Sequence, residues 1–78
     1  GIAMKTLKEM VELADNYPDT TVRTVVNLAY FGMVKEDESD AGDFTADDLA
    51  KKIRTFGFTP EAAATALNWI EINKQERR

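Results

Sequence analysis

Carboxylates are concentrated in one stretch of the chain, VKEDESDAGDFTADD, which covers residues 34–48. It holds seven Asp or Glu residues and a single lysine. Clustered carboxylate oxygens can hold a hard cation such as calcium, or they can present a negative surface to a positively charged partner. The stretch therefore has three possible interpretations: a metal site, a protein-binding segment, or a solvated connection without a function of its own.

The remaining composition limits the chemistry further. The 78-residue chain contains neither cysteine nor histidine, which removes the usual zinc ligands and the commonest general base. We therefore expect a protein that is not an enzyme and uses no cofactor. No apolar run approaches the roughly 18 residues of a membrane span, so we expect no membrane association and a cytoplasmic location.

Start and stop signals predict four helices that would position these groups. The start signals are, in chain order, Thr6 with Glu9, then Asp19 or Thr20, then Thr45 with Asp48, and finally Thr59 with Pro60. The stop signals are Asn16-Tyr17-Pro18 for the first helix, Gly32 for the second and Gly57 for the third.

The predicted fold is all-α: residues 1–78 form a single, compact four-helix domain made of two helix hairpins. Residues 35–44 would be an acidic loop or a short two-stranded wing between helices two and three. Residues 1–3 precede the first methionine, and we expect them to be an addition ahead of a native start at Met4. Trp69 is expected in the core.

The second helix is apolar nearly all round. Its main stripe is formed by Val22, Val25, Val26, Ala29 and Tyr30, and Leu28 and Phe31 widen it; the third helix carries Phe56 among its apolar residues. Such a helix needs cover from several helices or from a second chain, which makes a homodimer possible. An aromatic binding surface of Tyr30, Phe31 and Trp69 is an alternative to burial of Trp69.

Residues 37–48 resemble an EF-hand calcium loop and run directly into a helix. By that resemblance the metal ligands would be Asp37, Ser39, Asp43 and Asp48. Ala41 departs from the pattern, because a ligand oxygen is expected at this fifth place. A single, degenerate EF-hand calcium-binding protein remains one alternative function.

Residues 13–37, LADNYPDTTVRTVVNLAYFGMVKED, resemble the core of a winged helix-turn-helix domain. This likeness implies a DNA-binding transcriptional regulator with Lys35 to Asp43 as the wing. The exposed edge of its recognition helix would carry Thr20, Thr21, Arg23, Thr24 and Asn27.

Charge favours a protein partner over DNA. The chain carries a net charge of −4, whereas DNA affinity depends on Lys and Arg that neutralise phosphates. We therefore expect a small acidic regulatory or adaptor protein that binds the basic surface of another protein, which could itself be a nucleic-acid-binding protein. The expected partner-binding residues are Glu36, Asp37, Glu38, Asp40 and Asp43.

Overall fold

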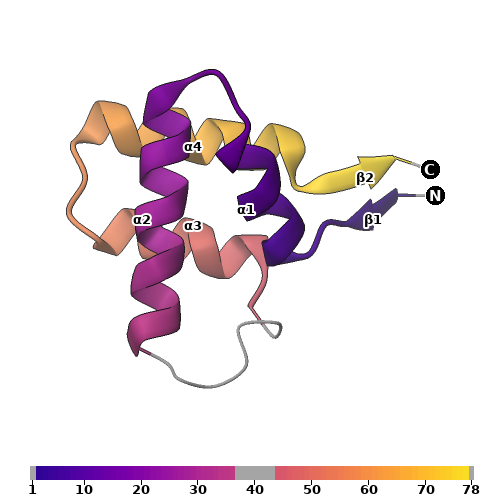
Figure 1. The fold of residues 1–78 in the computed structure, drawn as a ribbon, viewed down its shortest axis with the longest axis horizontal. Coiled ribbons are helices and arrows are strands. Elements are labelled where there is room, and N and C mark those ends of the chain that lie inside the picture. Colours follow the sequence, from indigo (N-terminus) through magenta and orange to yellow (C-terminus); the bar gives the residue numbers. More distant parts are fainter. Residues whose placement is uncertain (1, 37–43, 78) are drawn as a thin grey trace.

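A computed structural model describes residues 2–36 and 44–77 of the chain. Its helices are α1 (Leu7–Asp15), α2 (Thr20–Glu36), α3 (Ala46–Thr55) and α4 (Pro60–Asn73), and its strands are β1 (Ile2–Met4) and β2 (Gln75–Arg77). Figure 1 shows α2 crossing the hairpin formed by α3 and α4, with α1 beside it. The predicted all-α, four-helix fold is confirmed. No helix in this part of the chain combines the length and apolar character that a membrane crossing requires.

The predicted helix starts are correct. In α1 and α3 the capping threonine accepts a hydrogen bond from the backbone three residues on, and the carboxylate there accepts one in return, from Thr6 N to Glu9 and from Thr45 N to Asp48. Thr59 Oγ1 caps α4 by accepting a hydrogen bond from Ala62 N at 3.3 Å, without a carboxylate that returns a bond, and Pro60 lies in the first turn. These bonds satisfy amides that the helix itself leaves unpaired.

The predicted end of α2 at Gly32 is wrong, because the helix continues to Glu36. A Cβ atom at Gly32 would lie 2.9 Å from Phe56 Cε2 and 3.0 Å from Lys52 Cε. Glycine is therefore needed here for close approach of the end of α3, and not as a stop signal. Gly57, in contrast, follows α3 with a φ of 97° and ends it as predicted.

The core lies where α2 meets the other three helices. Its largest fully buried side chains come from all four helices: Leu7, Met10, Val22, Val26, Leu49, Ile53 and Ile70. No polar or charged side chain among the described residues is buried. The hydrophobic effect is therefore the main force that holds the four helices together.

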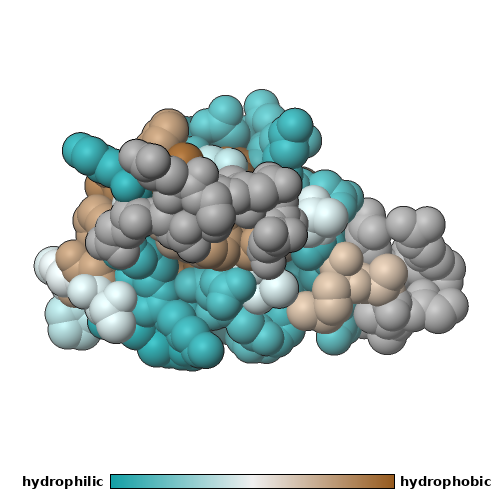
Figure 2. All heavy atoms as spheres, turned by 90° about the horizontal axis from the view of Figure 1, so that it is seen from below, coloured by the Kyte–Doolittle hydropathy of each residue, from teal (hydrophilic) through white to brown (hydrophobic). Residues whose placement is uncertain are grey.

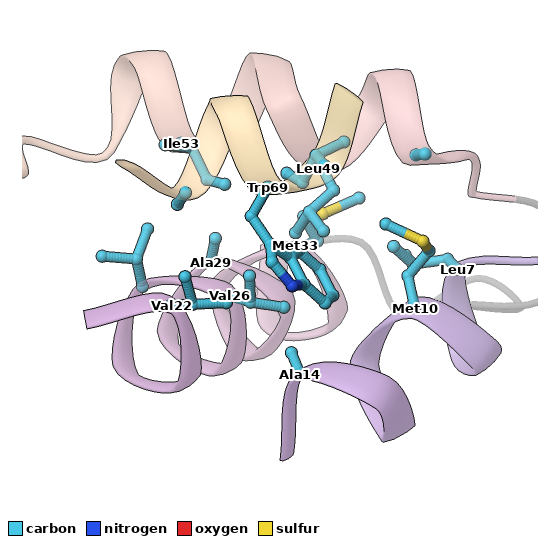
Figure 3. Close-up of a cluster of buried hydrophobic side chains, with 14 residues drawn as sticks. Leu7, Met10, Ala14, Val22, Val26, Ala29, Met33, Leu49, Ile53 and Trp69 are labelled. Atoms are coloured by element: carbon cyan, nitrogen blue, oxygen red, sulfur yellow. The ribbon is translucent and has the colours of Figure 1, made fainter. Parts of the chain in front are cut away.

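Trp69 occupies the core, as predicted, and is only 4% exposed. Figure 3 shows its indole extending from α4 into the cluster of buried side chains. The ring meets Tyr17 edge-on, with 5.6 Å between centroids, a favoured aromatic geometry. Its Nε1 donor is buried and has no hydrogen-bond acceptor among the described atoms. The residue thus combines a large hydrophobic contribution with an unsatisfied polar group.

The two ends of the described chain pair as a two-stranded antiparallel sheet, with Ala3 opposite Glu76. Lys5 reinforces the pairing: its Nζ donates to Asn73 O at 2.7 Å and to Gln75 O at 2.9 Å. The predicted wing lay elsewhere, between helices two and three. Residues 37–43 are outside the described part of the chain, and residues 35 and 36 belong to α2.

Gly57→Ala should lower the free energy of unfolding by about 1–2 kcal/mol, because a side chain at this left-handed φ is strained. The Cβ atom itself would meet nothing within 4 Å, so the loss would report backbone strain alone. Chemical denaturation measures it. Gly57→Asn is the control and should lose less, since asparagine tolerates positive φ better than alanine; equal losses for both would contradict this origin.

Trp69→Ala should destabilise the fold by about 3–5 kcal/mol through lost burial and a cavity. Trp69→Phe should lose less than half as much, because it retains most of the aromatic volume and removes the unsatisfied N–H. Denaturation followed by circular dichroism measures both variants. Equal destabilisation by the two would contradict the view that burial of the aromatic ring is what Trp69 contributes to stability.

Candidate protein-interaction surface

The predicted acidic site spans the connection between α2 and α3. Glu36 is the last residue of α2. The other four predicted contacts, Asp37, Glu38, Asp40 and Asp43, lie outside the described residues. The structure therefore gives the frame of this site, two helices that pack against each other, while its carboxylates remain a prediction from the sequence.

The last two carboxylates of the stretch have roles within the fold. Asp48 Oδ2 accepts hydrogen bonds from Thr45 N at 2.8 Å and from Thr45 Oγ1 at 3.1 Å. The carboxylate of Asp47 is exposed, 3.9 Å from Lys74 Nζ. Both sit in the first turn of α3, where negative charge is favourable beside the helix dipole. Asp47 and Asp48 therefore belong to the start of α3, and we treat them separately from the five predicted partner-binding carboxylates that precede them.

The calcium alternative shares one residue with this helix start. Of its proposed ligands, Asp37, Ser39 and Asp43 are outside the described residues. Asp48 is described, and its Oδ2 already holds the cap of α3. A calcium ion bound by both Asp48 oxygens would compete with that cap. Within residues 2–36 and 44–77, no three potential ligands come together in a metal-binding arrangement.

The five residues of the predicted recognition edge lie together in the first half of α2. They line two shallow hollows that meet at Thr24, one of about 380 Å³ with Arg23 and Asn27, and one of about 470 Å³ with Thr20 and Thr21. The structure thus brings together all five side chains that the sequence singled out.

Two of these side chains are turned toward their own chain. Arg23 Nη1 donates to Tyr17 O at 2.9 Å, and Asn27 Nδ2 donates to Arg23 O at 2.7 Å. Asp15 lines the same hollow as Arg23 and accepts a 3.4 Å hydrogen bond from Asn27. The local charge is therefore balanced, whereas a phosphate-binding surface carries an excess of cations.

An exposed apolar surface lies on α2, the helix that the sequence predicts to be apolar nearly all round. Leu28 is 45% exposed and Phe31 is 64% exposed, so the two residues that widen its apolar stripe lie at the surface. Phe56 is 41% exposed and stacks on Phe58 with 4.9 Å between ring centroids. We call Leu28, Phe31, Phe56 and Phe58 the α2 face.

The α2 face lies on the side of the helix away from the core. Val22, Val26, Ala29 and Met33 point inward, while Leu28 and Phe31 fall on the opposite side of the 3.6-residue turn. In Figure 2, apolar surface is exposed at the left of the view, the end of the molecule away from the termini. Exposed aromatic side chains are typical anchors of protein interfaces.

The signal for this surface was present in the sequence. Thr21, Thr24, Leu28, Phe31 and Lys35 follow one another at intervals of three and four, which is the spacing of a second stripe along a helix. Only the arrangement of the other helices could decide which stripe they cover.

Comparison of the chain with protein-family models, with curated proteins and with solved structures gives no match.

Proposed function

We propose that this chain is a non-enzymatic protein-binding domain, a small regulatory or adaptor protein. Its acidic segment, residues 36–43, would face a basic surface of the partner. The observation that carries the proposal is the concentration of five carboxylates in this segment against Lys35 alone, in the connection between α2 and α3. Such a cluster creates a local negative potential that attracts positively charged macromolecules.

Three cationic side chains form hydrogen bonds within the described part of the fold. Lys5 Nζ donates to two backbone carbonyls at the paired ends of the chain. Arg23 donates to Tyr17 O, and Lys74 donates to Glu71 Oε1 at 3.0 Å. None of these bonds uses a carboxylate of residues 36–43, which supports the proposal that a partner supplies the opposite charge.

Complementary charge would act mainly on the rate of association. Opposite charges on two proteins steer their diffusional encounter, and added salt screens the attraction beyond about 8 Å at physiological ionic strength. Binding through the acidic segment should therefore be fast at low salt and should slow steeply as salt is added.

The triple variant Asp37→Asn, Glu38→Gln, Asp40→Asn should slow association with a basic partner about tenfold at low salt, because it removes part of the steering charge. The partner is first captured from source cells at low salt on the immobilised wild-type chain and identified by mass spectrometry. Stopped-flow mixing of the two purified proteins then gives the association rate at several salt concentrations.

A second triple variant is the matched control. Glu12→Gln, Asp15→Asn and Glu61→Gln remove the same total charge from exposed positions on α1 and α4, and should slow association far less. Equal slowing by the two triple variants would mean that net charge alone matters. A wild-type association rate that does not change with salt would refute the steering role.

DNA binding is the second candidate, favoured by the gathering of Thr20, Thr21, Arg23, Thr24 and Asn27 on one edge of α2. An electrophoretic shift of duplex DNA at low salt separates it from protein binding. A shift that is lost on replacing Arg23 and Asn27 by alanine would favour this candidate. If the chain shifts no DNA at low salt, DNA binding is rejected and protein binding is the remaining proposal.

A further inference from the structure

The α2 face has the two properties that pairing with a copy of itself requires: an apolar ridge and an adjacent depression. Leu28 and Phe31 project from the second half of α2. The two hollows that share Thr24 lie beside them: Leu28 lines both, Phe31 lines the smaller one, and Val25, Phe58 and Ala62 line the larger one. Ridge and depression thus share one side of one helix.

We infer that the α2 face is a homodimer interface, in which two copies pack α2 against α2 in antiparallel orientation about a two-fold axis at Leu28. In a two-fold interface each residue meets a defined position of the other copy. Position 28 would meet itself, position 31 would meet positions 24–25, and position 35 would meet position 21. The inference rests on the α2 face and not on the acidic segment.

This pairing places unlike features opposite one another. Phe31 would lie over Thr24 of the second copy, where the two hollows meet. Lys35, at the end of α2, would approach the start of the second copy's α2, where Asp19 Oδ1 accepts a hydrogen bond from Thr21 N at 2.9 Å. Antiparallel packing places the negative end of one α2 beside the positive start of the other, and Asp19 supplies the negative charge that Lys35 needs at that positive start.

The stripe on which these residues lie has the geometry of a helix-pairing surface. Thr21, Thr24, Leu28, Phe31 and Lys35 alternate steps of three and four, as the contact positions of paired helices do. Residues 20–35 span about 24 Å at 1.5 Å per residue. The stripe therefore extends along nearly the whole of α2, with Leu28 at its centre.

The exposed apolar area predicts a weak dimer. At roughly 150–250 Å² per aromatic side chain, the exposed fractions of Phe31 and Phe56 leave on the order of 200 Å² of ring surface open. A stable interface buries about 800 Å² on each partner. Polar flanks must supply the rest, so we expect a dissociation constant between about 1 µM and 1 mM.

Sedimentation equilibrium at chain concentrations from about 1 µM to 1 mM tests the inference. The wild-type mass should rise with concentration toward twice the 8.7 kDa chain mass. Phe31→Ala should weaken the dimer at least tenfold. Ile72→Ala is the matched control, since Ile72 is 70% exposed on α4, and it should not change the association.

Charge substitution at the axis gives the sharper test. Leu28→Glu alone and Leu28→Lys alone should both be monomers, because each would bring like charges together at position 28. An equimolar mixture of the two should associate again as a heterodimer. Circular dichroism checks that each variant folds. We expect both to fold, because Leu28 is 45% exposed and its replacement leaves the core intact.

Three results would each overturn the inference. One is a wild-type chain that stays monomeric up to 1 mM. A second is a dimer that Phe31→Ala leaves intact or that Ile72→Ala disrupts. The third is a mixture of the Leu28 variants that does not associate, which would exclude a two-fold axis at this residue.

Discussion

The whole structure depends on how α2 is covered. This helix is apolar on two sides, and α1, α3 and α4 all pack on one of them. Burial of Val22, Val26 and Ala29 against three helices stabilises the fold, since each side chain removed from water contributes to stability. The same arrangement leaves Leu28 and Phe31 in solvent. One helix thus supplies both the centre of the core and two exposed apolar side chains of the described surface.

Local signals in the sequence predicted most of the fold. Thr6, Thr45 and Thr59 mark helix starts because each cap is a bond between neighbours in the chain, which needs no knowledge of the rest of the molecule. The misassigned residues depend on distant contacts. Gly32 looked like a stop signal, but it lies where Phe56 of another helix comes close. The pairing of residues 2–4 with residues 75–77 joins segments at opposite ends of the sequence, and no local pattern announces it.

The acidic segment and the α2 face also differ in how directly the sequence could predict them. Composition alone predicted the acidic segment, because carboxylates that are close in sequence stay close in space. The α2 face could not be predicted so directly, since Leu28 and Val25 look equally apolar in the sequence and differ only in which neighbour covers them. The two surfaces also rest on different forces. Salt weakens the attraction of the acidic segment for a distant cation, whereas contact between apolar side chains acts only at short range and is not screened in this way.

The pairing of β1 with β2 fixes where the polypeptide enters and leaves the domain. Both ends emerge together at one end of its 35 Å long axis, and the turn between α3 and α4 lies at the other (Figure 1). A domain with adjacent ends can be spliced into a surface loop of a larger host protein with little distortion of either. Grafted in this way, the four helices would stand out from the host on a two-stranded stalk, with Phe56 and Phe58 near the tip.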